Sequence, residues 1–310
     1  MASEDARSIR HPFRWILLTL LLLVLGYTYF AKFRLGLLVL VGRSPYCTFS
    51  RAIEAADELD RQIAIKDRLV VESRKTEEDP KGYHRWHTPD GDFWIPAGSD
   101  YSLHYNLAEE RRHIYGVGDQ ALREGDVVFD CGANIGVFTA LALKAKVKRI
   151  IAIEPAPENL ECFRRNFGGD IESGKIVLIP KGVWDKDDIL TLNVDPKNSA
   201  ADSFVLKPEG SVGKIQVPLT TIDKIVAQLG LDQVDFIKLD IEGAEANALR
   251  GAVETMRKFK PRVSVAAYHQ ANDPRQITNV VLGVGPDYKV ECGPCSELNN
   301  GVRPDILWFR

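Results

Sequence analysis

Four side chains that can bind ligands or move protons stand directly after predicted β-strands. They are Asp130, Glu154, Asp240 and His269, and each of them follows a short apolar run of the chain. In a mostly parallel sheet covered by helices, ligands bind beyond the carboxyl ends of the strands. We therefore expect these side chains along one sheet edge. Carboxylates there can bind a cation or accept hydrogen bonds, and an imidazole can take a proton.

The turn after Asp130 has the pattern D-x-G-x-x-x-G, in the stretch FDCGANIG. Gly132 permits a tight turn and close approach of a ligand to the backbone, and Gly136 lets the next helix pack against the sheet. Asn134 occupies the position at which the dinucleotide-binding fingerprint needs a glycine, which argues against a pyrophosphate ligand. The aspartate repels an anion and attracts an ammonium or sulfonium group. The alternative is a purely structural turn.

Glu154 ends the second strand and comes 22 residues after Gly132. A carboxylate in this position can accept hydrogen bonds from both hydroxyls of a ribose. Together with Asp130, it predicts a nucleoside that carries a positive charge in place of a diphosphate. S-adenosylmethionine fits that description. A glutamate with only a surface role is the alternative.

Four stretches of the chain resemble the FkbM-type methyltransferases, a branch of the class I S-adenosylmethionine-dependent fold. They are FDCGANIG, AIEPAPEN, DFIKLDIEGAEANALRGA and AAYH, and the resemblance extends over about residues 125–273. It implies methylation of a hydroxyl of a sugar or natural product. It also implies these cofactor contacts: Asp130, Gly132, Asn134 and Gly136 around the methionine part, Glu154 on the ribose, and Gly182 and Val183 near the adenine.

The candidate catalytic residues are Asp240, Glu242 and His269. Methyl transfer to a hydroxyl needs a base, and His269 is the first candidate because a histidine takes a proton near neutral pH. Asp240 is the second, since it can also orient the hydroxyl or help to ligate a metal. Glu245 is interpreted as a helix-start residue, where the helix dipole favours a carboxylate. A hard-metal site of Asp240, His269 and Asp273 is an alternative. No metal is predicted.

Apolar strands alternate with helical segments from residue 127 onward, which predicts a doubly wound, mostly parallel α/β sheet. With the resemblance, this becomes a Rossmann-like class I methyltransferase sheet. We expect a methyltransferase domain at 83–310, made of an N-terminal cap at 83–124 and the Rossmann-like core at 125–310. Residues 44–82 are expected to form a helical linker.

Residues 1–43 form the expected anchor segment, with a transmembrane helix at about 13–31. About 19 apolar residues roughly match the thickness of a bilayer core. Three basic residues stand on each side of this span, so charge does not decide the orientation. Because S-adenosylmethionine is made in the cytosol, we expect a single-pass membrane protein with a cytosolic catalytic domain. The anchor suggests a lipid-linked saccharide as acceptor, beside free small molecules.

Net charge and cysteine content bear on nucleic-acid binding and on cysteine-based sites. A net charge of -3 without a basic stripe gives no support for nucleic-acid binding. The five scattered cysteines are expected to be free thiols in a reducing compartment. The CGPC stretch, Cys292 to Cys295, is interpreted as a turn, because a zinc site would need a second pair of ligands.

The sequence therefore predicts a membrane-anchored, S-adenosylmethionine-dependent O-methyltransferase that acts on a hydroxyl of a sugar, glycolipid or natural product. A nicotinamide-dependent oxidoreductase is one alternative, which the missing fingerprint glycine at Asn134 opposes. A non-catalytic, membrane-tethered nucleoside-binding module is the other. The four polar strand ends oppose it, because a decayed site would not need them.

Overall fold

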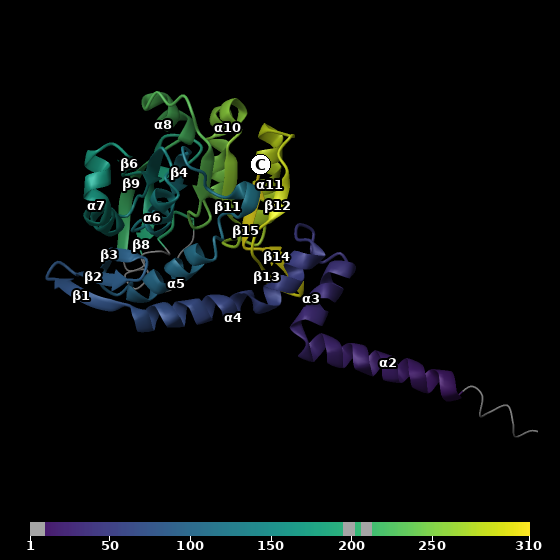
Figure 1. Cartoon of the computed structure of the whole chain (residues 1–310). Coiled ribbons are helices and arrows are strands. Elements are labelled where there is room, and N and C mark those ends of the chain that lie inside the picture. Colours follow the sequence, from purple (N-terminus) through teal and green to yellow (C-terminus); the bar gives the residue numbers. More distant parts are fainter. Residues whose placement is uncertain (1–9, 195–201, 206–212) are drawn as a thin grey trace, which may run out of the picture.

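A seven-stranded sheet flanked by helices forms the centre of the computed structural model, which describes residues 10–194, 202–205 and 213–310 (Figure 1). In spatial order, the strands are β12 (Val290–Cys292), β15 (Ile306–Phe309), β11 (Arg262–Ala266), β10 (Phe236–Leu239), β4 (Val127–Cys131), β5 (Arg149–Ile153) and β6 (Ile176–Ile179). The strands from β11 to β6 pair in parallel, whereas β15 pairs antiparallel with β11 and β12. The expected α/β fold with a mostly parallel sheet is confirmed.

Helices cover both faces of this sheet, because successive side chains of a strand point to opposite faces. Val128 packs in one core with Phe138 and Phe163, while its neighbour Phe129 packs in a second core with Ile277. The first face carries α5 (Asp100–Arg111), α6 (Val137–Lys144) and α7 (Pro157–Glu172). The second carries α8 (Ile222–Gln228), α9 (Glu245–Arg250), α10 (Val253–Phe259) and α11 (Asp273–Val284).

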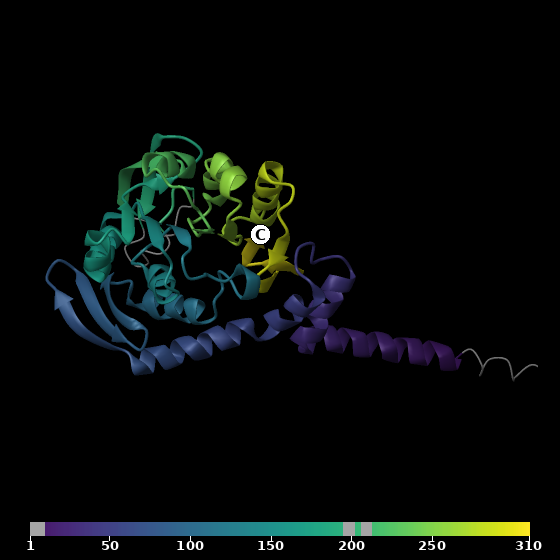
Figure 2. The same cartoon turned by 45° about the horizontal axis from the view of Figure 1, so that its top comes forward.

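An antiparallel sheet precedes the core in the chain and packs beside α7. Its strands are β1 (Arg74–Asp79), β2 (Tyr83–Thr88) and β3 (Gly91–Pro96). The backbone N–H of Trp94 in β3 donates a hydrogen bond of 2.6 Å to Oδ1 of Asn166 in α7. The long helix α4 (Phe49–Glu72) runs along α5 below the core (Figure 2). The smaller elements are β7 (Gly182–Val183), β8 (Asp188–Val194), β9 (Gly213–Thr220), β13 (Cys295–Leu298), β14 (Gly301–Pro304) and a 3₁₀ helix at Gly118–Gln120.

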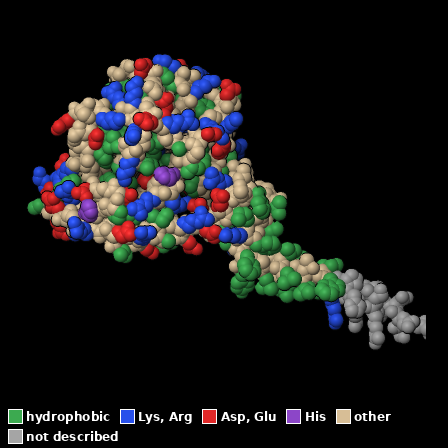
Figure 3. Space-filling view, viewed as in Figure 1, with side chains coloured by type: hydrophobic (Ala, Val, Ile, Leu, Met, Phe, Trp, Pro, Cys, Tyr) green, Lys and Arg blue, Asp and Glu red, His purple; other side chains and the backbone are tan. Residues whose placement is uncertain are grey.

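Two apolar helices, α2 (Arg10–Tyr29) and α3 (Ala31–Leu40), begin the described chain. α3 packs on the body of the protein, where Arg34 binds both carboxylate oxygens of Glu297 at 2.8 Å. α2 projects away from the body and carries exposed hydrophobic side chains from Trp15 to Leu25 (Figure 3). Within the described chain, no single helix has the length and hydropathy needed to cross a membrane. A bent pair, Arg14–Tyr29 with Ala31–Leu40 at 109°, meets those criteria jointly.

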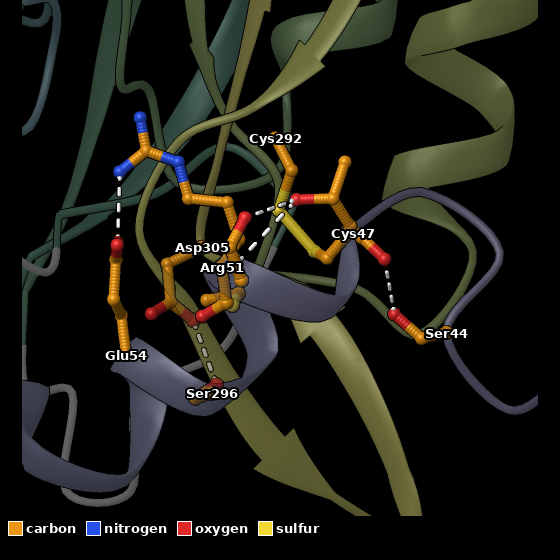
Figure 4. Close-up of a disulfide and its surroundings, with 10 residues drawn as sticks. Ser44, Cys47, Arg51, Glu54, Cys292, Ser296 and Asp305 are labelled. Carbon is orange, nitrogen blue, oxygen red and sulfur yellow. Dashed lines mark hydrogen bonds and ion pairs between the residues drawn. A yellow bond between two sulfur atoms is a disulfide. The ribbon is translucent and has the colours of Figure 1, made fainter. Parts of the chain in front are cut away.

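A disulfide joins Cys47, in the loop between α3 and α4, to Cys292 at the end of β12 (Figure 4). The expectation of five free thiols is therefore wrong; Cys131, Cys162 and Cys295 are the free ones. The two bonded cysteines stand 245 residues apart, and only the packing of α3 and α4 against β13 and β14 brings them together. The CGPC stretch connects β12 to β13.

We expect this disulfide to stabilise the fold by about 2–4 kcal/mol, because it closes a very long loop of the unfolded chain. Dithiothreitol should lower the Tm of the full-length protein in detergent by about 3–6 °C. The Cys47→Ser variant should have the lower Tm already and should not respond to the reductant. Calorimetry measures both temperatures. Alkylation of five thiols in protein purified without reductant would contradict the disulfide.

Candidate active site

A cavity of about 360 Å³ opens at the carboxyl ends of β4 and β10, and α5 covers it from the other side. A smaller pocket adjoins it and shares part of its wall, namely Gly132, Asn134, Asp240 and Glu242. Of the four polar residues expected at the strand ends, Asp240 and Glu154 line these two pockets, whereas Asp130 and His269 lie behind their walls. The residues of the larger cavity that matter below are Tyr101, Tyr105, Glu109, Glu110, Tyr115, Lys238 and Tyr268.

The turn after β4 approaches the end of β10 so closely that only glycine fits at position 132. Gly132 has a φ of +78°, and a Cβ atom there would lie 1.9 Å from the carbonyl oxygen of Asp240. Its own carbonyl oxygen accepts a hydrogen bond of 2.8 Å from Nζ of Lys238. The backbone of this turn thus forms a floor shared by both pockets.

Gly136 and Asp130 support the turn from beneath the cavity wall. A Cβ atom at Gly136 would lie 2.1 Å from the ring of Phe167, so this glycine lets α6 begin close to α7. The buried Asp130 accepts a hydrogen bond of 2.8 Å from the hydroxyl of Thr139 and lies 3.3 Å from Nζ of Lys238. Direct contact of either residue with a cofactor stays a prediction.

Glu154 lies in the smaller pocket together with Gly182 and Val183, as expected for residues that hold one nucleoside. Its Oε2 accepts the backbone N–H of Asn134 at 2.8 Å, and its Oε1 accepts that of Ala156 at 2.8 Å. Burial raises the pKa of this carboxyl, whereas the backbone donors oppose the rise. The carboxylate is therefore held rigidly between the turn after β4 and the start of α7.

Asp240, Glu242 and His269 converge where β10 and β11 end. Nε2 of His269 lies 3.5 Å from Oδ1 of Asp240 and 3.4 Å from Oε2 of Glu242. Its Nδ1 lies 2.9 Å from Oε1 of Glu245. The histidine side chain is only 3 % exposed and stands behind the two carboxylates of the cavity wall.

The surrounding carboxylates decide the protonation of His269. Burial alone would lower its pKa, but Glu242, Glu245 and Asp240 together raise the pKa to about 11. An imidazolium has no free lone pair with which to take a proton. His269 can therefore act as the base, as predicted, only when it has first lost this proton.

Glu245 combines a helix-start position with a contact to the cluster. Its Oε1 accepts the backbone N–H of Ile241 at 2.9 Å and that of Gly243 at 3.3 Å, which satisfies donors just before α9. The same oxygen faces His269. Glu242 adopts a left-handed backbone conformation with a φ of +52°, which is costly for a residue with a side chain.

The residues that sequence reasoning missed come from α5 and the segment after it. Tyr101, Tyr105 and Glu109 stand four residues apart, so one face of α5 presents all three to the cavity. Tyr115 donates a hydrogen bond through its hydroxyl to Oδ2 of Asp240. Apart from that helical spacing, no local pattern distinguishes these residues, because only tertiary packing brings α5 over the sheet edge.

Acidic groups dominate the cavity wall, although not all of them carry charge. Burial raises the pKa of Glu109 to about 8, with Asp240 adding to the rise, and it raises the pKa of Glu110 well above its usual value. Lys238, almost fully buried, faces them as a cation, and its nearby acids raise its pKa although burial lowers it. Such a wall can accept a cationic ligand and orient a hydroxyl group.

The chain is similar to known methyltransferases. Residues 130–288, just over half of the chain, match the family model described as the methyltransferase FkbM domain. The 31-O-demethyl-FK506 methyltransferase FkbM of Streptomyces tacrolimicus is 26% identical over 206 residues, which are 57% of this chain and 78% of that protein. The hexuronic acid methyltransferase AglP of Haloferax volcanii is 23% identical over 159 residues, 51% of this chain and 62% of that protein.

A solved structure with the same family name is also similar. The methyltransferase FkbM of Methylobacillus flagellatus superposes with a TM-score of 0.46 and 20% sequence identity, over 84% of this chain and 62% of that chain. The match of the family model begins at Asp130, the end of β4, and includes the turn, Glu154, Asp240 and His269. This chain belongs to the FkbM methyltransferase domain family, and it is a methyltransferase.

Proposed function

We propose that this protein transfers a methyl group from S-adenosylmethionine to a hydroxyl of a sugar, glycolipid or natural product. The observation that carries the proposal is the pair of adjoining pockets that share Gly132 and Asn134. The smaller pocket offers the Glu154 carboxylate to a ribose. The larger one offers aromatic and acidic side chains to an acceptor.

The residues present suit a sulfonium nucleoside. A Cβ atom at Gly132 would clash with the carbonyl oxygen of Asp240, so glycine lets the turn after β4 pack against the end of β10 in the wall of both pockets. The acidic wall attracts a positive charge. When bound, S-adenosylmethionine supplies a methyl group activated by its sulfonium sulfur. The remaining chemistry belongs to side chains that hold the acceptor.

Asp240 is the residue that we expect to orient the acceptor hydroxyl and receive its proton. Its Oδ2 is held by the hydroxyl of Tyr115. Its Oδ1 is buried and accepts no hydrogen bond from the residues that the structure describes. As the bond from the hydroxyl oxygen to the methyl carbon forms, the carbon–sulfur bond breaks and sulfur keeps its electron pair. The hydroxyl proton then passes to a carboxylate of the cluster.

Relatives and aromatic side chains support a sugar as acceptor. The similar AglP is named for hexuronic acid, and the similar FkbM is named for a hydroxyl of FK506. Tyr101 and Tyr268 both line the cavity and keep 69% and 43% of their surface exposed, which leaves ring faces for a sugar to stack on. We propose a sugar ring, free or lipid-linked, as the first class of acceptor to test.

We also propose that the bent helix pair α2–α3 anchors the protein in a membrane as a single pass, with the catalytic domain in the cytosol. The exposed apolar side chains of α2 support the anchor, and the cytosolic supply of S-adenosylmethionine supports the orientation. The Cys47–Cys292 disulfide argues for the opposite side, because stable disulfides are rare in the cytosol. A direct test of orientation is therefore needed.

Fusion of reporters to the C-terminus decides the orientation. In a bacterial host, green fluorescent protein should fluoresce on the full-length chain, because it matures in the cytosol. Alkaline phosphatase, which needs an oxidising compartment, should stay inactive at the same position. An active phosphatase fusion with a dark fluorescent fusion would place the catalytic domain outside the cytosol and overturn this part of the proposal.

The Glu154→Gln change should weaken S-adenosylmethionine binding by about 10- to 100-fold, because the charged acceptor for the ribose hydroxyls is lost. Calorimetric titration of the full-length protein in detergent measures the Kd. Glu172→Gln, the same change at an exposed position of α7, is the matched control and should leave the Kd unchanged. Equal affinity in both variants would remove Glu154 from the binding site, and binding of NADH instead would favour the oxidoreductase.

The Asp240→Asn change should lower kcat for methyl transfer by about 100- to 10,000-fold, since the amide cannot receive the hydroxyl proton. Transfer of the label from radiolabelled S-adenosylmethionine is measured with a panel of acceptor sugars that includes uronic acids. The Kd for S-adenosylmethionine should rise by less than about tenfold, because Asp240 is part of the pocket wall but Glu154 still holds the ribose. Asp232→Asn, at an exposed loop position, is the control and should be as active as the unaltered protein. Unchanged kcat in Asp240→Asn would exclude it as the base.

A further inference from the structure

Three potential ligand atoms from the ends of two strands meet at one point beside the cavity. They belong to Asp240, Glu242 and His269, each of which offers one ligand atom within 4.8 Å of the other two. Nε2 of His269 is 3.5 Å from Oδ1 of Asp240 and 3.4 Å from Oε2 of Glu242. Ligands at about 2.1 Å from one ion are spaced roughly 3.0–3.5 Å from their neighbours, so these separations suit a shared cation.

A third carboxylate, that of Glu245, lies behind the histidine. It completes the arrangement that metal-binding histidines usually show. Nδ1 of His269 lies 2.9 Å from Glu245, whose oxygen is fixed by the backbone N–H groups of Ile241 and Gly243. A carboxylate on one ring nitrogen keeps the proton there and aims the lone pair of the other nitrogen outward. In His269 that other nitrogen is Nε2, which faces the two cavity carboxylates.

The converging atoms lack the partners that would otherwise stabilise them. Oδ1 of Asp240 and Nε2 of His269 are buried, and neither makes a hydrogen bond of regular geometry with any residue that the structure describes. The other oxygen of Asp240 is held by Tyr115, so the free oxygen keeps a fixed direction. The two carboxylates repel one another unless a positive charge, either the protonated His269 or a bound cation, lies beside them, and the costly backbone of Glu242 holds its side chain in this position.

The position relative to the cavity leaves one side of such a cation open. Asp240 and Glu242 belong to the cavity wall, while His269 stands behind them. An ion bound by all three would therefore have free coordination positions toward the cavity, as catalytic metal sites do. Two carboxylates and one imidazole suit Mn²⁺ and similar hard or borderline divalent ions.

We propose that Asp240, Glu242 and His269 bind one divalent cation of the Mn²⁺ class, which holds the acceptor hydroxyl in the cavity. The role toward the acceptor rests on the proposed function, but binding of the cation does not. A bound cation replaces the proton between His269 and the carboxylates. It also explains why two acids and a histidine are kept together next to the acceptor.

Titration with Mn²⁺ alone tests the site, with loss of the electron paramagnetic resonance signal of the free ion as readout. Full-length protein in detergent, first stripped with EDTA, should bind one Mn²⁺ per chain. Glu242→Gln and Asp240→Asn keep the side-chain volume and should each weaken binding at least tenfold. Asp232→Asn is the control and should bind as the unaltered protein does. No binding, or equal binding in Glu242→Gln, would overturn the proposal.

Two further readouts separate this proposal from the methyltransferase mechanism. S-adenosylmethionine should still bind the EDTA-stripped protein, since Glu154, Gly182 and Val183 of the smaller pocket are not ligands of the proposed cation. Methyl transfer should fall at least tenfold in EDTA and return with Mn²⁺. Full methyl transfer in EDTA would contradict the proposed role of the cation and leave the methyltransferase function intact. Stoichiometric Mn²⁺ binding without any S-adenosylmethionine binding would support the cation site and contradict the proposed methyl donor.

Discussion

Lys238 is the buried cation on which the geometry of the site depends. The parallel register of β10 with β4 sets Lys238 opposite Asp130, which gives an ion pair of 3.3 Å at the end of both strands. The same ammonium group donates to the carbonyl oxygen of Gly132 and lies over the ring of Tyr115. Removing it would leave Asp130 and its acidic neighbours uncompensated, at a cost of about 3–5 kcal/mol.

This single contact links the two halves of the site. Through Gly132, Lys238 holds the turn that forms part of the wall of the smaller pocket. Through the alternation of side chains in β10, it stands on the same face as Asp240, two residues further on. A change in register of β10 would therefore move the turn and the acceptor side together. Gly132 packs directly against the carbonyl group of Asp240, so the turn and the end of β10 cannot move closer together.

Local sequence signals predicted the part of the site that lies on the central sheet. Asp130 lies near the end of β4, and Glu154, Asp240 and His269 follow the ends of β5, β10 and β11 by one to three residues. Parallel strands bring such ends to one edge. Tyr115 and the α5 face could not be predicted in the same way, because their approach to Asp240 depends on how the cap packs. The Cys47–Cys292 bond was missed for the same physical reason, a contact between segments 245 residues apart.

The helices α3 and α4 are fixed to the body of the protein, and α2 continues from α3. The disulfide, the Arg34–Glu297 ion pair and the packing of α4 along α5 connect the apolar α2–α3 segment to the cover of the cavity. A helix that enters a bilayer would thus fix the position of α5 relative to the membrane surface. The cavity would then stand at a set height above the lipid, which suits an acceptor that carries its sugar on a lipid. The proposed anchor and the proposed acceptor site would in this way be parts of a single geometric constraint.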